Sequence, residues 1–143
     1  MDEAFWQVIL STNLVGPYRC AKAAAAALRE ARGAIINTAS VAGLGTRGSS
    51  LAYSASKAGL INLTRNLAKA MAPDVRVNAV APGLVDTPWT RAWSEERKQG
   101  TIERSLLKRL VQPTDVAQAI VFLAQQSAIT GEVLVVDCGS SVT

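Results

Sequence analysis

Apolar side chains recur with the helical period in some stretches of the chain and form short unbroken runs in others. The first helical pattern runs from about Asp2 to Ala31, and the Asn, Gly and Pro in its middle predict a kink or break there. A second helix is predicted over Leu51–Met71, and a third begins at Pro113 with Gln112 or a neighbour as its cap. The apolar stripe of the second helix consists of Leu60, Leu63, Leu67 and Met71. The third helix is predicted to bury Val116, Ile120, Val121, Leu123 and Ala124.

Between these helical patterns lie runs rich in β-branched residues. They predict strands over Ala34–Thr38, Val75–Ala81 and Val133–Val136. Alternation of helices with such runs is typical of a parallel sheet that helices cover, so the fold class is predicted to be α/β. The sequence contains no internal repeat, low-complexity tract or linker, and residues 1–143 are therefore expected to form a single unit.

Two segments fit neither pattern. The loop Gly43–Ser50 has few large side chains, which favours an exposed loop or the lining of a cleft. The stretch Leu84–Val111 is polar, carries the charge run Glu95–Lys98 and is interpreted as a mobile helical flap. Its tryptophans, Trp89 and Trp93, either cover a substrate or simply pack.

Composition narrows the possible classes of protein. An apolar fraction of 49% with 18% charged residues is that of a globular protein. The net charge is +4, but the basic residues are spread without a dense run, which favours a solvated surface over nucleic-acid binding. The chain has no histidine and two distant cysteines, so neither a zinc site nor a Ser-His-Asp triad is expected.

Neither a signal peptide nor a membrane span is expected from the sequence. The start, Met1–Glu3, is acidic where a signal peptide would be basic, and no apolar run has the length of a membrane span. A cytoplasmic protein with no membrane partner is the expectation.

Candidate chemistry lies at the start of the second helix. Tyr53 and Lys57 are four residues apart and therefore share one helical face. A phenol has a pKa of about 10, and a neighbouring cation favours its ionised form, which makes Tyr53 a candidate acid or base. By itself this spacing fits a surface tyrosine beside a solvated lysine equally well. The position of Ser40 favours the acid or base over the surface pair. Ser40 follows a predicted strand, and parallel sheets bind ligands just beyond the C-terminal ends of their strands.

Four segments in order and spacing resemble the short-chain dehydrogenase/reductase family. They are Gly33–Ser40, Tyr53–Leu60, Val75–Gly83 and Thr130–Asp137, and together they extend over essentially the whole chain. The resemblance implies a partial Rossmann-like, doubly wound parallel sheet: the last three strands with their flanking helices, without the N-terminal βαβ half.

The resemblance also implies roles for four residues. Tyr53 would donate or remove the proton at a carbonyl or alcohol oxygen, and Ser40 would hydrogen-bond the same oxygen. Lys57 would lower the pKa of the tyrosine and hold the nicotinamide ribose. Asn13 would support a water-linked proton path behind them.

The cofactor implied by the resemblance is NAD or NADP. Its nicotinamide would lie at the turn formed by Pro82 and Gly83, with Val85 and Thr87 just beyond, together with Tyr53 and Lys57. A chain that breaks at this point leaves unpaired backbone donors for a ligand amide. The alternative is an ordinary strand-ending turn.

Two further residues of the matching segments are interpreted as structural. Asn78 is expected to brace a loop, and Asp137 to cap a strand end. Cys138 stands where the family usually has glycine, which is expected to strain a turn that needs positive φ.

The first half of the family pattern, with its glycine-rich diphosphate turn, is not found in these 143 residues. The strand Ala34–Thr38 should then be an exposed edge, and poor solubility or association is expected. Two functions are compatible with this. One is a truncated oxidoreductase that interconverts a small-molecule ketone and a secondary alcohol and needs the missing half. The other is a catalytically silent oligomerisation fragment, since relatives form dimers or tetramers through the first two helices.

Overall fold

A three-stranded parallel sheet lies at the centre of the computed structural model, which describes residues 2–45 and 48–142. The strands are β1 (Ala34–Thr38), β2 (Arg76–Pro82) and β3 (Val133–Val136), and their spatial order is β1-β2-β3. Both pairs are parallel. The predicted α/β class is confirmed, and the second strand begins and ends one residue later than predicted.

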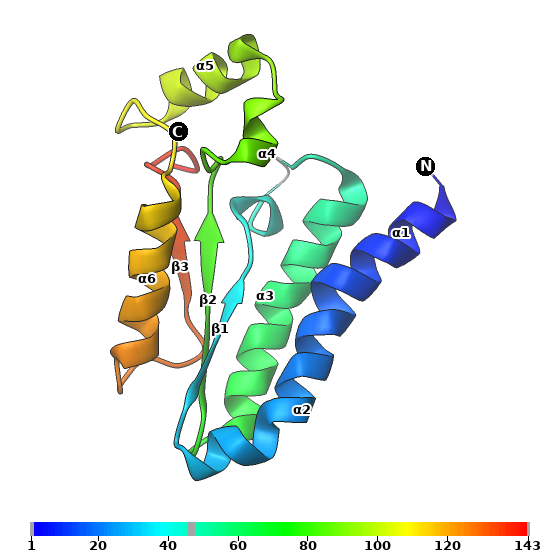
Figure 1. Cartoon of the computed structure of the whole chain (residues 1–143), viewed down its shortest axis with the longest axis vertical. Helices are drawn as coiled ribbons and strands as arrows, with labels where there is room; N and C mark the ends of the chain where they lie inside the picture. The colour runs from blue at the N-terminus through cyan, green and yellow to red at the C-terminus, as the bar shows by residue number, and fades with distance from the viewer. Residues whose placement is uncertain (1, 46–47, 143) are drawn as a thin grey trace.

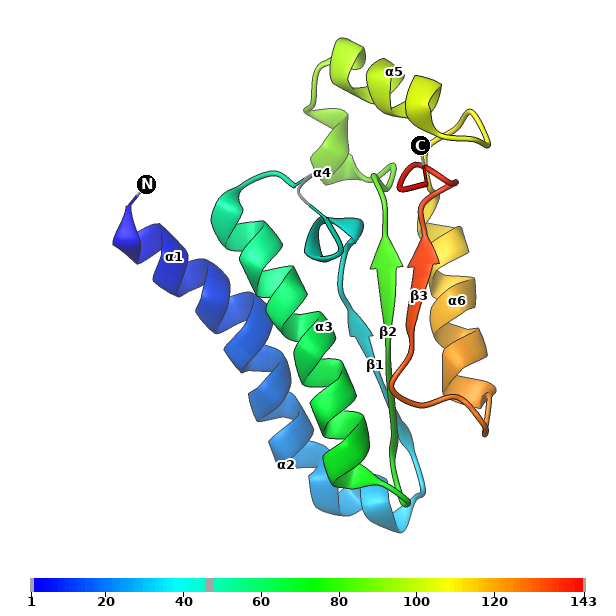
Figure 2. The same cartoon turned by 180° about the vertical axis from the view of Figure 1, so that it is seen from behind.

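Helices cover both faces of this sheet (Figures 1 and 2). On one side lie α1 (Glu3–Leu10), the π-helical turn η1 (Ser11–Val15), α2 (Gly16–Glu30) and α3 (Leu51–Met71). On the other side lies α6 (Pro113–Gln125). Gln112 is the cap of α6, as predicted, and its backbone N–H donates to Asp115 Oδ2 over 2.8 Å.

The first helical segment is continuous, so of the kink or break predicted near Asn13, the break is wrong. The irregularity takes the shape of the wide turn η1, which leads directly into α2. Pro17 lies in the first turn of α2, where its missing N–H costs least. Leu14 of η1 packs against Gly59 of α3: a Cβ at Gly59 would lie 3.0 Å from Leu14 Cδ2. The glycine lets the two helices approach closely.

The core is built around β2, whose residues from Val77 to Pro82 are buried. This fits a parallel strand that is covered on both faces. From α3, Leu60 and Met71 are buried, and the predicted stripe residues Leu63 and Leu67 are half-buried.

In α6, Leu123 is buried and Val116 and Ile120 are half-buried, as predicted. Val121 is 52% exposed and Ala124 is also exposed. Their inclusion in the apolar side of this helix is therefore wrong. Both residues lie outside the arc of the helix that contacts the sheet.

The segment predicted as a helical flap contains α4 (Pro88–Arg91) and α5 (Glu95–Arg104), which lie beyond the C-terminal ends of the strands (Figure 1). The rings of Trp89 and Trp93 meet edge to face with their centres 5.3 Å apart. The guanidinium carbon of Arg97 lies 3.5 Å from the centre of the Trp93 ring. These contacts give the polar segment a small packed cluster of its own.

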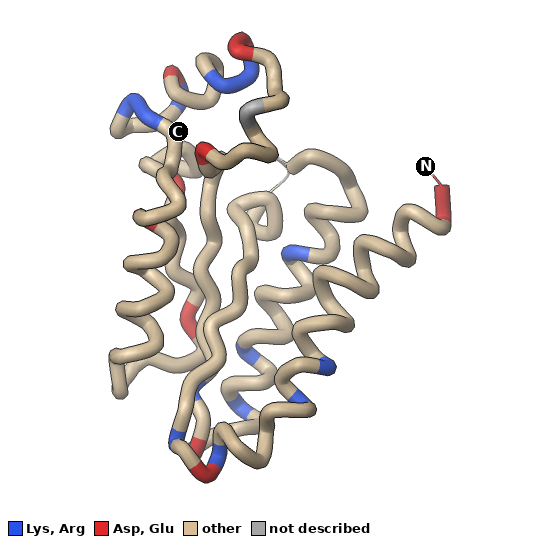
Figure 3. Tube along the Cα trace, in the orientation of Figure 1, with Lys and Arg blue, Asp and Glu red and all other residues tan. Residues whose placement is uncertain are grey.

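The loop predicted over Gly43–Ser50 follows the 3₁₀ turn η2 (Val41–Gly43), which ends at Gly43. Residues 46 and 47 of this loop lie outside the described part of the chain, as does Met1. Figure 3 shows lysines and arginines at separate points along the helices and around α5. Within the described ranges, no helix is both long and apolar enough to cross a bilayer.

Candidate functional site

The end of β1 carries Ser40 toward the start of α3. Ser40 caps η2, and its Oγ accepts a hydrogen bond of 3.2 Å from the backbone N–H of Ala42. A Cβ at Gly43 would lie 2.6 Å from the carbonyl carbon of Lys57. Only a residue without a side chain allows this approach, so Gly43 holds η2 against the helix that carries Tyr53 and Lys57.

Tyr53 lies in the first turn of α3, and Lys57 lies one turn later. Ser50 caps the helix by accepting a 3.1 Å hydrogen bond from the N–H of Tyr53. Lys57 Nζ lies 5.7 Å from the centre of the Tyr53 ring. The predicted sharing of one helical face is thus found in the structure.

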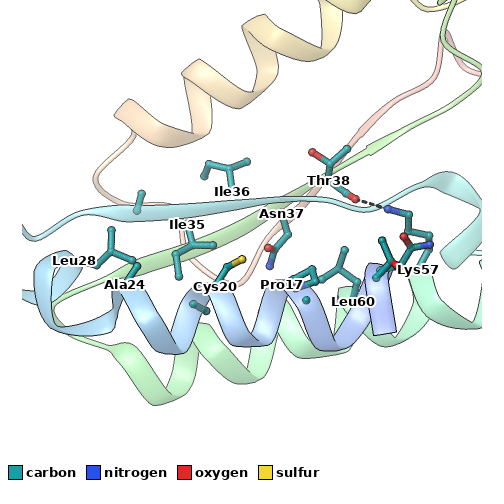
Figure 4. Close-up of a pocket in the computed structure, with 15 residues that line it drawn as sticks. Pro17, Cys20, Ala24, Leu28, Ile35, Ile36, Asn37, Thr38, Lys57 and Leu60 are labelled. Atoms are coloured by element: carbon teal, nitrogen blue, oxygen red, sulfur yellow. Dashed lines mark hydrogen bonds between the residues drawn. The ribbon is translucent and has the colours of Figure 1, made fainter. Parts of the chain in front are cut away.

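The ammonium of Lys57 also reaches back to the sheet. Its Nζ donates a 2.8 Å hydrogen bond to the carbonyl oxygen of Thr38, the last residue of β1 (Figure 4). Burial lowers the pKa of Lys57 from its ordinary value of 10.5. The side chain therefore links the helix that carries Tyr53 to the strand end that precedes Ser40.

Asn13 is joined to the same region through a residue that the sequence analysis did not single out. Its Nδ2 donates a 3.1 Å hydrogen bond to Ser56 Oγ, and the Ser56 hydroxyl donates to the carbonyl oxygen of Tyr53 over 2.7 Å. Ser56 is fully buried. Its position three residues after Tyr53, on the same helical face, is the signal that could have identified it.

The turn after β2 is more fully hydrogen-bonded than the sequence suggested. Pro82 is the last residue of β2, and the N–H of Gly83 donates to the carbonyl oxygen of Val136 over 3.0 Å. A Cβ at Gly83 would lie 2.9 Å from Asp137 Cβ. Gly83 therefore lets the ends of β2 and β3 meet, and its N–H is not one of the unpaired donors expected where the chain breaks.

Just beyond it, Thr87 caps α4. The N–H of Thr87 donates to Thr90 Oγ1 over 2.8 Å, and the Thr90 hydroxyl is within 2.7 Å of the carbonyl oxygen of Val85. Among the residues that the structure describes, no hydrogen bond uses the N–H of Leu84 or that of Val85. These two amides are the backbone donors of the turn that remain for a ligand.

The predicted site residues thus form two groups at the C-terminal ends of the strands. Asn13, Tyr53 and Lys57 are connected through α3, with Ser40 held nearby by η2. The turn from Pro82 to Thr87 follows the neighbouring strand. No hydrogen bond joins the two groups within residues 2–45 and 48–142.

A nicotinamide dinucleotide fits these residues at one end only. The ammonium of Lys57 and the N–H of Val85 are suitable donors for a ribose hydroxyl and a carboxamide oxygen. The sequence offers no glycine-rich turn before a helix for the diphosphate.

A groove of about 570 Å³ lies beside this region, between α2 and β1 (Figure 4). Asn13, Thr38 and Lys57 are among the residues that line it, whereas Ser40 and Tyr53 do not line it. The rest of its lining is mainly small or apolar.

Asn78 and Asp137 have structural roles, as expected. Asn78 Nδ2 donates to the carbonyl oxygen of Ile129 over 2.8 Å, and its Oδ1 accepts from the N–H of Glu132 over 3.0 Å. The Asp137 carboxylate accepts hydrogen bonds from the residues that follow β3, among them the N–H of Ser141 at 2.7 Å. Partial burial acts to raise the pKa of Asp137, but these hydrogen bonds outweigh it and leave the pKa below its ordinary value.

The chain is similar in sequence to a known family profile and to known proteins. A family profile described as enoyl-(acyl carrier protein) reductase matches residues 1–141. The short-chain dehydrogenase/reductase homolog YusR of Bacillus subtilis is 39% identical over 128 residues, which cover 89% of this chain and 98% of YusR. The 3-oxoacyl-[acyl-carrier-protein] reductase FabG of Thermotoga maritima is 36% identical, over 97% of this chain and 58% of that protein.

Among solved structures, a 3-oxoacyl-[acyl-carrier protein] reductase from Brucella melitensis with bound NAD superimposes with a TM-score of 0.90 at 31% identity. The superposition covers 100% of this chain and 54% of that one. The chain thus spans nearly all of YusR but little more than half of the two reductases. On the family profile, the identity to these relatives and the shared fold, the chain belongs to the short-chain dehydrogenase/reductase family.

Proposed function

We propose that residues 1–143 form, as one unit, the C-terminal portion of an NAD(P)-dependent oxidoreductase that interconverts a ketone and a secondary alcohol. The observation that carries this proposal is the placement of the Lys57 ammonium 5.7 Å from the centre of the Tyr53 ring, at the C-terminal end of a parallel sheet. A cation beside a phenol favours transfer of its proton. The cytoplasmic location remains a prediction.

Each side chain of the site has a separate task in this proposal. Tyr53 donates its phenolic proton to the oxygen of the ketone, or accepts it in the reverse direction. Ser40 donates a hydrogen bond to the same oxygen, because its Oγ accepts from Ala42 N–H and its own proton is still available. Asn13, anchored through Ser56, orients the first turn of α3 and borders the path along which the proton of Tyr53 is replaced.

The cofactor would be held by the residues of both groups. Lys57 would bind the ribose beside Tyr53, and the Val85 N–H would bind the carboxamide. Pro82, Gly83 and Thr87 would shape the turn around it. When bound, the nicotinamide supplies or accepts the hydride. NAD and NADP are both compatible with these residues.

Replacement of one hydroxyl tests the proposal. In the completed protein, formed by this chain with the part of a full-length relative that it lacks, Tyr53→Phe should lower kcat for reduction of a 3-oxoacyl compound by about 10²–10⁴-fold. The control is Tyr18→Phe, because Tyr18 is exposed on α2. Full reductase activity in Tyr53→Phe would show that the proton comes from another group.

A second candidate is a catalytically silent fragment that associates through its first two helices. Exposed apolar side chains on the first helical segment favour it: Phe5, Val8 (62% exposed), Val15 and Tyr18. Titration with NAD(H) and NADP(H) separates the two candidates. A chain that assembles but binds neither dinucleotide, even in the completed protein, would support the silent fragment.

A further inference from the structure

The turn that follows β2 is held on one side by the end of the flap, Leu84–Val111. Val85 forms a parallel bridge with Val111. In this bridge the N–H of Asp86 donates to the carbonyl oxygen of Val111 over 2.8 Å, and the N–H of Val111 donates to that of Leu84 over 3.1 Å. Backbone groups of an extended chain alternate between its two sides. The N–H and C=O groups of Val85 itself therefore point away from Val111.

On this second side of the turn, one hydroxyl group binds two backbone groups. Thr90 Oγ1 accepts a hydrogen bond from the N–H of Thr87 over 2.8 Å. Its own proton goes to the nearer of two carbonyl oxygens, that of Val85 at 2.7 Å, since that of Thr87 is 3.0 Å away. The hydroxyl thus does what one residue of a neighbouring parallel strand would do: it donates to a carbonyl oxygen and accepts from the N–H two residues later.

Burial makes these two hydrogen bonds costly to lose. Thr90 is 4% exposed although it lies in a polar segment, so water has little access to its hydroxyl. The N–H of Thr90 also donates to Thr87 Oγ1 over 3.4 Å, which completes a capping box at the start of α4. The turn and the first turn of α4 are therefore held together as one unit.

The hydroxyl of Thr90 decides which backbone group of Val85 is left for a ligand. The carbonyl oxygen of Val85 is bound by Thr90, whereas its N–H has no partner within residues 2–45 and 48–142. A fixed N–H beside an occupied carbonyl oxygen binds an acceptor and offers nothing to a donor. At Val85 the turn is therefore arranged for the oxygen of a carboxamide and not for its NH₂ group.

We infer that Thr90 is a positioning residue for the dinucleotide: its hydroxyl holds the turn so that the N–H of Val85 is presented to the carboxamide oxygen. Without the hydroxyl, the Val85 carbonyl oxygen and the Thr87 N–H would lose their partner, and the backbone around them would turn toward other partners. The carboxamide would then lose a fixed donor. This inference rests on the proposed function for the identity of the ligand and on the hydrogen bonds of Thr90 for the positioning itself.

Amide hydrogen exchange of the full chain tests the positioning without any cofactor. Thr90→Val keeps the shape of the side chain but removes its hydroxyl, so exchange of the Thr87 amide should become about tenfold faster or more. Thr90→Ser keeps the hydroxyl and should leave this rate within about threefold of the original. Thr101→Val is the matched control, because the Thr101 hydroxyl lies in the same flap and donates within α5, to the carbonyl oxygen of Arg97 over 3.0 Å. Circular dichroism establishes that each variant is folded.

Binding by the completed protein tests the link to the ligand. Thr90→Val should raise the Kd of NADH or NADPH by about tenfold, and Thr90→Ser should bind as the original chain does. For an analogue of the dinucleotide whose pyridine ring lacks the carboxamide, Thr90→Val should change the Kd by about twofold or less. A residue that only stabilises the flap would affect both ligands equally.

Three results would overturn the inference. They are an unchanged exchange rate of the Thr87 amide in Thr90→Val, an equal loss of affinity for the dinucleotide and the analogue, and a Thr90→Ser variant that binds as weakly as Thr90→Val. Failure of the proposed function gives a different result. The completed protein would then bind no dinucleotide, while exchange of the Thr87 amide would still depend on the Thr90 hydroxyl.

Discussion

Lys57 and Thr38 are joined by a 2.8 Å hydrogen bond from the ammonium to the last carbonyl oxygen of β1. The bond ties the helix that carries Tyr53 to the strand that leads to Ser40. It also brings a cation out of bulk water, which lowers the pKa of Lys57. The packing of Lys57 against the end of β1 therefore determines both the position of its ammonium and the direction of its pKa shift.

Replacement of Lys57 should change how stability depends on pH. Because the folded chain holds this proton less tightly than the unfolded chain, the free energy of unfolding should rise with pH between the lowered pKa and 10.5. Below the lowered pKa, the full cost of burying the ammonium is present. Lys57→Met should reduce this rise, as measured by urea unfolding from neutral pH to about pH 10. The exposed Lys69, changed to Met, is the control, and an unchanged rise in Lys57→Met would contradict the assignment.

The approach of η2 to α3 should depend on Gly43. A Cβ there would lie 2.6 Å from the carbonyl carbon of Lys57, whereas a Cβ at Gly45 meets no atom within 4 Å. Gly43→Ala should lower the free energy of unfolding by about 1–3 kcal/mol, because backbone must move. Gly45→Ala should change it by about 0.5 kcal/mol or less. Urea unfolding of both variants decides the matter, and equal stabilities would show that η2 is not held at this contact.

Much of the fold could be predicted because local signals agree with tertiary packing. The bounds of β1, α3 and β3 match the prediction: β-branched runs mark the strands, and the apolar stripe marks the helix. The form of the wide turn at Ser11–Val15 could not be predicted, and its Leu14 packs against Gly59, a residue distant in sequence. The Asn, Gly and Pro of this stretch indicate that the helix is irregular there, but they do not indicate the form of the irregularity.

The candidate site likewise has one part that the sequence predicts and one part that it does not. The spacing of Tyr53 and Lys57 predicts a shared helical face because helical geometry is fixed. The partners that hold these residues could not be predicted, since Ser56 and the carbonyl oxygen of Thr38 act through hydrogen bonds between segments distant in sequence. The bonded state of Gly83 likewise depends on β3, more than fifty residues later.

Asn13 and Ser56 should stabilise the fold as a coupled pair. Ser56→Ala removes both the acceptor of the Asn13 amide and the donor to the Tyr53 carbonyl oxygen, which should cost about 1–3 kcal/mol. Asn13→Ala should cost less in the Ser56→Ala background than alone, with a coupling energy of about 0.5–1 kcal/mol in a double-mutant cycle. Asn66→Ala removes hydrogen bonds from an exposed part of α3 and is the control. Strict additivity of the Asn13 and Ser56 variants would show that the bond does not connect the two helices energetically.

The turn after β3 should become more stable when its cysteine is replaced by glycine. Cys138 has φ of +57° and Gly139 has φ of +78°, a conformation that costs a residue with a side chain about 1–2 kcal/mol. Cys138→Gly relieves this strain but increases the freedom of the unfolded chain, so the net gain should be about 1 kcal/mol or less. Gly139→Ala should have the opposite sign, because it adds strain and places a Cβ 2.9 Å from the Leu106 side chain. Thermal unfolding measures both variants under reducing conditions. A lower Tm for Cys138→Gly would mean that packing of the thiol outweighs the backbone strain.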